Sequence, residues 1–157
     1  MNSPNSNIAH GSLGRAYQDL GRLEEAIREY KKAIEIFPDD YKAYYNLGVI
    51  YDRQGALKEA VANYKRTIVI NPAFTNAHFN LGNIYHNKGL LEEAIHQYRK
   101  VTELDPADFE ARSNLGVAYA RQGKLDLAIA QWKKVLEMDP QNKSVGDNIK
   151  KAKEMME

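Results

Sequence analysis

Residues 47–72 read LGVIYDRQGALKEAVANYKRTIVINP, and this stretch decides the fold. It opens on a Leu-Gly pair, has a second glycine at Gly55, places Ala60 and Tyr64 four residues apart, and ends at Pro72. The same residues return every 34 positions in both directions along the chain, as from Leu47 to Leu81. A fixed period of this length is typical of proteins built from stacked repeats.

Four copies of this pattern align without gaps. The Leu-Gly pairs occupy residues 13–14, 47–48, 81–82 and 115–116, and they are followed by a tyrosine (Tyr17, Tyr51, Tyr85 and Tyr119) and a second glycine (Gly21, Gly55, Gly89 and Gly123). The second half of each copy has an alanine (Ala26, Ala60, Ala94 and Ala128) and then an aromatic residue (Tyr30, Tyr64, Tyr98 and Trp132). Each copy ends at a proline: Pro38, Pro72, Pro106 and Pro140.

Each copy predicts two antiparallel helices, at about 41–54 and 58–71 in the second copy. Apolar residues recur there at helical spacing rather than in alternation. Gly55 is expected to end the first helix in a left-handed turn, and Pro72 prevents continuation of the second. Gly48 and Ala60 are small, which indicates a close helix contact with tyrosines around it. Replacing either by leucine is expected to overpack that contact.

These columns resemble the tetratricopeptide repeat, whose Leu-Gly-x-x-Tyr, Ala-x-x-x-aromatic and Pro pattern is present in every copy. The resemblance implies an all-α fold, an α-solenoid of antiparallel helix pairs that forms a right-handed superhelix. It also implies that the first helix of each pair (helix A) lines a concave groove. The column that usually holds Trp departs from the family pattern and reads His10, Tyr44, His78 and Arg112.

The expected organisation is a single domain over residues 1–157. Its repeats span about 7–40, 41–74, 75–108 and 109–142, and an amphipathic capping helix follows at about 143–156 with Val145, Ile149, Ala152 and Met156 on its apolar stripe. The first repeat has no comparable cap and contains Gly11, which weakens a helix by about 1 kcal/mol. A fragment of a longer chain, or a first repeat that packs on another molecule, is therefore expected; a naturally short protein with a frayed end is the alternative.

Composition restricts the function classes. A net charge of +1 argues against a nucleic-acid partner, which requires a concentrated basic face. The chain has no cysteine for disulfides, thiol catalysis or thiolate metal sites. No apolar run reaches the roughly 20 residues of a membrane span. The polar start lacks the features of a secretory signal, so a cytoplasmic location is expected.

No residues converge on a catalytic pattern. His78 and His86 lie on one predicted helix without the glutamate spacing of a zinc-protease motif. His10 and His78 occupy a column held by an aromatic ring elsewhere, which indicates packing or surface roles. We therefore expect no enzyme activity, no cofactor and no metal.

The column just before the Leu-Gly pair reads Ser12, Asn46, Asn80 and Asn114. A carboxamide both donates and accepts hydrogen bonds, so a row of them suits the backbone of an extended peptide. This row resembles the asparagine ladder in the peptide-binding superhelix of O-linked N-acetylglucosamine transferase. Asparagine is also common at this position across the family, so its presence does not by itself establish a ligand.

The remaining candidate groove residues surround this column. They comprise two aromatic side chains, three basic ones and two further asparagines: Tyr45, Phe79, Lys42, Arg53, Arg121, Asn83 and Asn87. The resemblance also argues against binding of acidic chaperone tails. Gly11, Arg15, Asn76 and Asn80 stand where that clamp of lysines, arginine and asparagines needs other residues.

The sequence therefore predicts a scaffold that binds an extended or helical segment of a partner protein in its groove. Two alternatives remain. One is a self-assembling scaffold that forms a homo-oligomer through its exposed first repeat, and the other is a substrate-recruiting arm of a larger enzyme.

Overall fold

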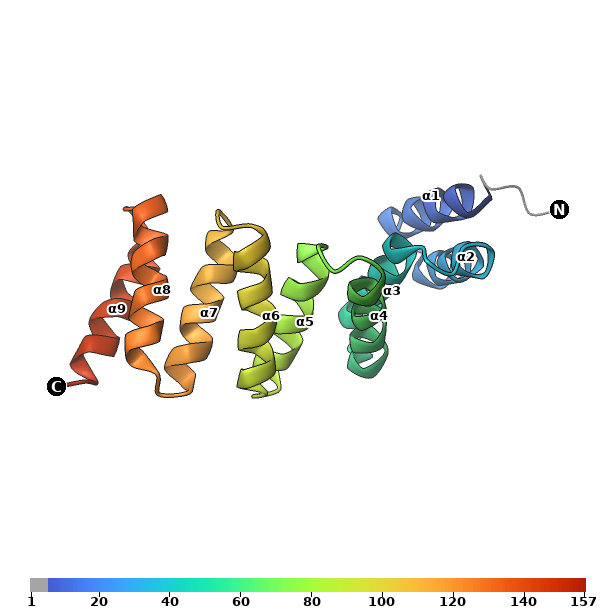
Figure 1. The fold of residues 1–157 in the computed structure, drawn as a ribbon. Coiled ribbons are helices and arrows are strands. Elements are labelled where there is room, and N and C mark those ends of the chain that lie inside the picture. Colours follow the sequence, from blue (N-terminus) through green and yellow to red (C-terminus); the bar gives the residue numbers. More distant parts are fainter. Residues whose placement is uncertain (1–5) are drawn as a thin grey trace. The chain divides into compact units, whose positions relative to one another are not determined.

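The computed structural model describes residues 6–157. Within these residues the chain consists of α-helices joined by short turns, with no strand (Figure 1). The helices are α1 (Ser6–Asp19), α2 (Leu23–Ile36), α3 (Tyr41–Arg53), α4 (Leu57–Ile70), α5 (Thr75–Asn87), α6 (Leu91–Leu104), α7 (Phe109–Arg121), α8 (Leu125–Met138) and α9 (Lys143–Glu154). The all-α expectation is confirmed.

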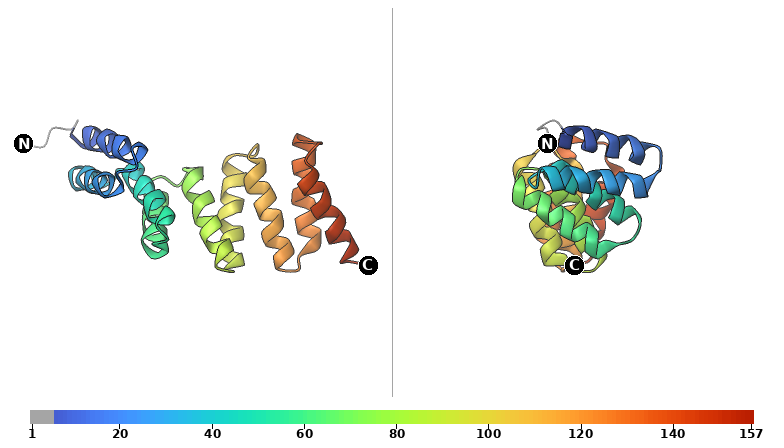
Figure 2. Two further views of the ribbon diagram at one scale, coloured as in Figure 1. Left: turned by 180° about the vertical axis from the view of Figure 1, so that it is seen from behind. Right: turned by 90° about the vertical axis from the view of Figure 1, so that its right-hand side faces the viewer.

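Successive helices pack as antiparallel pairs, α1 with α2, α3 with α4 and α7 with α8 (Figures 1 and 2). Phe79 and Tyr85 of α5 likewise pack against the cluster that contains Tyr98 of α6. The chain divides between Ala77 and His78 into two compact units, each with its own core. In the first unit α2 also packs on α3, and in the second α6 packs on α7 and α8 on α9.

The helix limits differ slightly from the expected ones. In the second repeat α3 ends at Arg53 and α4 begins at Leu57, each within one residue of the limit read from the sequence. The last helix stops earlier than expected, at Glu154. Met156 lies beyond it and is 50% exposed, so the apolar stripe of α9 does not reach that residue. The polar first residues, 1–5, lie outside the described residues.

The turns follow from the glycine column. Gly55 has a φ of +73°, in the left-handed region where a side chain clashes with the backbone. Its amide donates to the Asp52 carbonyl and the amide of Ala56 donates to the Tyr51 carbonyl, which closes the end of α3. Three other glycines repeat this conformation at the same phase: Gly21, Gly89 and Gly123.

The glycine of each Leu-Gly pair faces an aromatic ring of its partner helix. A Cβ atom on Gly48 would stand 2.6 Å from Cε1 of Tyr64, closer than packed atoms approach. Tyr64 itself is 1% exposed and cannot move into solvent without opening the repeat. Three other pairs repeat the contact: Gly14 with Tyr30, Gly82 with Tyr98 and Gly116 with Trp132. The close approach of the two helices thus occurs between a glycine backbone and an aromatic ring.

The first unit buries a cluster that joins Ala26, Tyr30 and Ala33 of α2 to Leu47 and Ile50 of α3. This contact between successive repeats is the one that a single helix pair cannot make alone.

The second unit has two clusters, one between α6 and α7 and one at its C-terminal end. In the latter, Val145 and Ala152 of α9 cover the single tryptophan, Trp132, of α8. Asn142 caps α9 by accepting a hydrogen bond from the Val145 amide at 3.2 Å. The helix expected to cap the chain thus packs on the last repeat and covers its apolar end.

Among the described helices, none combines the length and the apolar character needed to cross a bilayer.

Candidate functional site

The predicted ladder residues lie on the A helices. Asn46, Asn80 and Asn114 stand at the same point of α3, α5 and α7, and each is half-buried. Ser12 of α1 holds the equivalent position and is exposed. A half-buried carboxamide is partly desolvated already, so a ligand that pairs with it removes little further water.

Two of these asparagines are not committed to intramolecular bonds. The side chains of Asn46 and Asn114 make no hydrogen bond with any other residue of the described part of the chain. Asn80 differs, because it has an interaction of its own within the protein. Each of the two units therefore has one free carboxamide at this position, Asn46 in the first unit and Asn114 in the second.

The two aromatic candidates are partly used in packing. The ring of Tyr45 lies 4.9 Å from that of Phe74 and 5.9 Å from that of Tyr64, and Phe79 lies 6.1 Å from Tyr98. Both Tyr45 and Phe79 remain half-buried, so part of the surface of each side chain is still exposed. Their first role is to cover the buried tyrosine of their own repeat.

Asn83 is held by the repeat itself. The hydroxyl of Tyr98 donates a 2.7 Å hydrogen bond to Oδ1 of Asn83, and burial raises the pKa of Tyr98 so that this donor stays protonated. The carboxamide nitrogen of Asn83 is the group left for a ligand. Among the remaining candidates, Lys42, Arg53 and Asn87 are exposed.

Arg121 and His86 form a direct contact between α7 and α5. One guanidinium nitrogen of Arg121, Nη1, donates to Nε2 of His86 and to the His86 carbonyl oxygen, both at 3.1 Å. Burial, and then the charge of Arg121, lower the pKa of His86. His86 is therefore a neutral acceptor at physiological pH, and Arg121 is tied to the end of α5 rather than free to reach into a groove.

The variable column three residues before the Leu-Gly pair joins each A helix to its partner. Nδ1 of His10 lies 2.6 Å from Glu29, and Nδ1 of His78 lies 2.7 Å from Gln97. The bond from His10, and then that from Lys32, lower the pKa of Glu29. In the last repeat Arg112 contacts Gln131 at 3.4 Å and donates to the Pro106 carbonyl at 3.0 Å. These histidines act in helix pairing, and no group of three or more His, Asp or Glu in the described residues could hold a metal.

The first unit contains a cavity of about 340 Å³ between α1 and α3 that the sequence did not predict. Two predicted residues, Lys42 and Asn46, line it together with Gly11 and Arg15 of α1. The available signal was Gly11, which stands where the next two repeats have Tyr45 and Phe79. From the sequence, Gly11 indicates a weak point in a helix and a missing clamp residue, and neither of these predicts a cavity.

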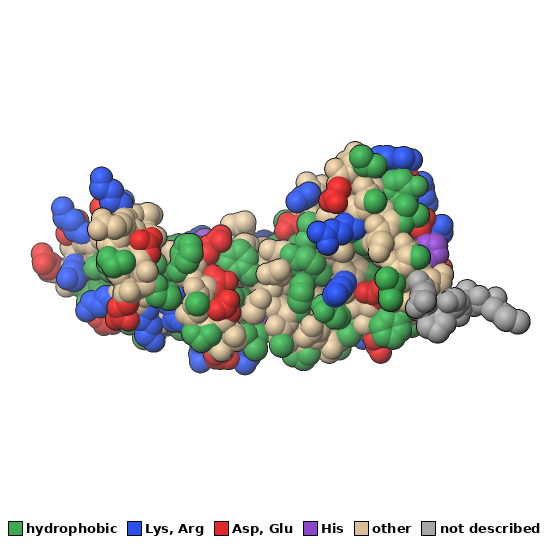
Figure 3. Space-filling view, turned by 90° about the horizontal axis from the view of Figure 1, so that it is seen from above, with side chains coloured by type: hydrophobic (Ala, Val, Ile, Leu, Met, Phe, Trp, Pro, Cys, Tyr) green, Lys and Arg blue, Asp and Glu red, His purple; other side chains and the backbone are tan. Residues whose placement is uncertain are grey.

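The face drawn in Figure 3 carries basic, acidic and hydrophobic side chains interspersed with one another. This mixture agrees with the net charge of +1 and gives no single-sign surface there.

The family of the chain follows from matches along most of its length. The model described as "TPR repeat" matches residues 14–55, 50–89 and 82–123, and the model described as "Tetratricopeptide repeat" matches 109–142. The chain belongs to the tetratricopeptide repeat family. Its helix pairs are therefore tetratricopeptide repeats, and the α-solenoid class expected for them is confirmed.

Solved structures of other tetratricopeptide repeat proteins have the same fold. A crystal structure of MamA has a TM-score of 0.80 at 29% identity and covers 88% of this chain and 81% of its own. A crystal structure of YrrB, described as a TPR protein with an unusual peptide-binding site, has a TM-score of 0.85 at 25% identity and covers 93% and 75%. A second MamA structure, at 23% identity and a TM-score of 0.88, shows the fold alone. No curated protein sequence gives a significant match.

Proposed function

We propose that this tetratricopeptide repeat chain is a non-catalytic scaffold that binds a segment of a partner protein along its A helices. The observation that carries the proposal is the pair of half-buried, uncommitted carboxamides of Asn46 and Asn114, with Asn80 at the same repeat phase between them. The fold is typical of protein–protein interaction, and the similar YrrB structure is described as having a peptide-binding site.

An extended segment fits these side chains better than a helical one. A carboxamide can donate to a backbone carbonyl and accept from a backbone amide at the same time. A bound helix has already satisfied those groups internally, whereas an extended strand presents them. Tyr45 and Phe79 then cover apolar side chains of the segment, and Asn83 and Asn87 add polar contacts beside the column.

Selection from a random-sequence peptide library on the immobilised full chain tests this function. We expect enrichment of peptides that bind the wild-type chain and bind more weakly when Asn46, Asn80 and Asn114 are all replaced by alanine. No enrichment above an uncoated surface would count against peptide binding. Enriched peptides that turn helical on binding, by circular dichroism, would contradict the extended mode.

Self-assembly is a second candidate, favoured by the outer face of α1. Leu13 is 43% exposed, whereas its equivalents Leu47 and Leu115 are 3% and 2% exposed. Leu47 is buried against α2 and Leu115 against α6, which are the helices of the preceding repeats. The corresponding face of α1 is therefore an apolar surface of the kind that a helix of another repeat covers elsewhere in the chain. Ala16 extends this exposed face.

Light scattering after size-exclusion chromatography separates the two candidates. If α1 joins two copies, the chain forms a dimer at high concentration and Ala16→Glu, which places a charge on the exposed face, returns it to a monomer. A monomer at every concentration would exclude self-assembly through α1. A dimer that Ala16→Glu leaves intact would exclude this face as the interface.

A further inference from the structure

The second repeat lacks a polar contact that the other three repeats have. In those three, the residue three positions before the Leu-Gly pair contacts a side chain of the partner helix 19 residues later: His10 with Glu29, His78 with Gln97 and Arg112 with Gln131. The corresponding residues of the second repeat are Tyr44 and Asn63. The guanidinium carbon of Arg66 lies over the Tyr44 ring instead, 5.8 Å from its centroid.

A cavity of about 310 Å³ is lined by both Tyr44 and Asn63. Asparagine is one methylene shorter than the glutamate or glutamine of the other repeats, and the carboxamide nitrogen of Asn63 donates to the Glu59 carbonyl of its own helix at 2.8 Å. The carboxamide oxygen of Asn63, Oδ1, accepts no hydrogen bond from the described part of the chain. The cavity therefore contains an acceptor without a donor.

The rest of the lining is apolar or balanced in charge. Ile34 of α2 and Leu47 and Tyr51 of α3 line the cavity, together with two exposed residues of α2, Lys31 and Glu35. Lys31 and Glu35 have opposite charges, and neither forms an ion pair within residues 6–157. The lining thus has no net charge, which favours a neutral ligand over an ion.

This cavity is separate from the proposed peptide site. Tyr44 and Asn46 both belong to α3, but two residues correspond to about 200° around an α-helix, so the two side chains point to opposite sides of α3. The second helices of two repeats, α2 and α4, border the cavity, whereas the asparagine column follows the A helices. A ligand in this cavity leaves Asn46 free.

The size and lining of the cavity suit one aromatic side chain. A volume of about 310 Å³ is at the lower end of the range for ligand pockets, so the cavity takes a ring rather than a folded segment. Ile34, Tyr44 and Tyr51 provide apolar contact for such a ring. Oδ1 of Asn63 requires a donor, and Lys31 is an unpaired cation that the face of an aromatic ring attracts. Indole combines a donor-only N–H with the aromatic face that binds cations best.

We propose that this cavity binds a tryptophan side chain of a partner protein. The indole lies among Ile34, Tyr44 and Tyr51, its N–H donates to Oδ1 of Asn63, and Lys31 contacts its face.

A second copy of this chain does not supply the indole. The sequence has a single tryptophan, Trp132, which is 3% exposed and packs against α9. The site therefore depends neither on self-assembly nor on the asparagine column, and it goes beyond the proposed function.

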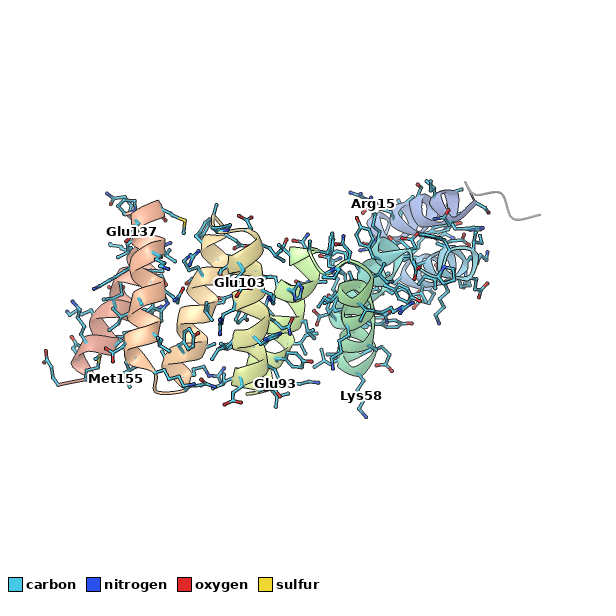
Figure 4. The ribbon with its side chains drawn as sticks, viewed as in Figure 1. Arg15, Lys58, Glu93, Glu103, Glu137 and Met155 are labelled. Carbon is cyan, nitrogen blue, oxygen red and sulfur yellow. The ribbon has the colours of Figure 1, made fainter. Side chains whose placement is uncertain are left out.

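Subtractive selection tests this site. A random-sequence peptide library is depleted on the double variant Tyr44→His and Asn63→Gln and is then selected on the full wild-type chain. The double variant has the residue pair of the third repeat, His78 and Gln97, so it fills the space and keeps the asparagine column. We expect the enriched peptides to share a tryptophan. Lys58 projects from the N-terminal end of α4 (Figure 4), and the control variant Lys58→Gln should bind these peptides as the wild-type chain does.

Substitutions in one enriched peptide measure the contacts of the indole. Tryptophan replaced by alanine should weaken binding to the wild-type chain by about 30-fold or more, the loss typical of an aromatic anchor in a pocket. Phenylalanine keeps an aromatic ring but removes the N–H donor, so a loss of about two- to tenfold is expected.

Methyl NMR of the wild-type chain gives a readout that does not depend on any variant. Binding of an enriched peptide should shift the methyl resonances of Ile34 and Leu47, because an aromatic ring then lies beside them. Enriched peptides without a tryptophan, or unchanged Ile34 and Leu47 resonances, would overturn the proposal. No enrichment after depletion on a double variant that circular dichroism shows to be folded would also overturn it. Peptides that bind here and keep their affinity for the triple asparagine variant leave the proposed groove function to its own test.

Discussion

At the scale of single residues, stability depends on glycines that have opposite environments. A Cβ atom on Gly48 would stand 2.6 Å from Cε1 of Tyr64, whereas a Cβ atom on Gly11 would meet nothing within 4 Å. We expect Gly48→Ala to destabilise the chain by about 1–3 kcal/mol, because overpacking outweighs the gain of about 1 kcal/mol in helix propensity. Thermal or urea unfolding measures the change.

Gly11→Ala is the matched control for this substitution. It adds the same methyl group to a helical glycine without a clash, so the free energy of unfolding should rise by about 1 kcal/mol. Equal effects of the two substitutions would refute the assignment of Gly48 as a packing glycine.

The Arg121–His86 contact makes a second prediction at this scale. Burial and Arg121 both lower the pKa of His86 in the folded chain. Arg121→Gln removes the second cause only, so the pKa of His86 should rise but stay below that of an exposed histidine. Histidine resonances followed by NMR titration measure it, with the exposed Arg99→Gln as a control. An unchanged pKa would mean that the contact is not maintained in solution.

The same shift predicts a direction for stability against pH. Unfolding returns His86 to its ordinary value near 6.5, so the unfolded chain binds more protons below that pH. The free energy of unfolding should therefore fall as the pH is lowered from about 6.5 toward the lowered pKa of His86 in the folded chain. At higher pH the contribution of His86 to stability is constant.

At the scale of elements, α9 protects the end of the second unit. Ala152 is 3% exposed and packs in the cluster that contains Trp132. Ala152→Glu should displace α9, because a charged side chain is costly to bury there. We expect a lower melting temperature and red-shifted emission from Trp132, the single tryptophan. The exposed Lys153→Gln on the same helix should change neither, and an unshifted emission in Ala152→Glu would argue against this packing.

Most of the elements could be predicted from the sequence, because their signals are local. Apolar spacing defines each helix, and glycines such as Gly55 and prolines such as Pro72 mark its end. The predicted end of α9 is too late because Met156 fits an apolar stripe by spacing alone. Spacing does not tell whether another helix is near enough to cover that residue.

The site could be predicted only in part. The column of Asn46, Asn80 and Asn114 is visible because it repeats, but the engagement of Asn83 by Tyr98 depends on which rotamers the packed repeat allows. The cavity beside Gly11 is the opposite case. It arises from a side chain that is missing in one repeat, and a search for shared residues overlooks an absence.

At the scale of the whole molecule, the residues that build the repeats differ from the residues that are left for a partner. Three kinds of contact recur within the repeats and stabilise them. They are the packing of a glycine on an aromatic ring, the left-handed turn at a glycine, and polar contacts between the two helices of a repeat such as that of His10 with Glu29. The asparagine column recurs equally, yet Asn46 and Asn114 contribute no hydrogen bond to the described fold. These two side chains, which contribute no hydrogen bond to the fold, are the basis for the proposed peptide site.

Calorimetric titration tests this claim most directly. One selected peptide is titrated into the wild-type chain and into the triple variant Asn46→Ala, Asn80→Ala and Asn114→Ala. Each hydrogen bond that the variant loses to the peptide should reduce the binding free energy by about 0.5–1.5 kcal/mol. We therefore expect the triple variant to bind the peptide about tenfold or more weakly than the wild-type chain, with unchanged helicity. Asn148→Ala on α9 is the control and should leave the affinity unchanged. Equal affinity of the wild-type chain and the triple variant would contradict the account.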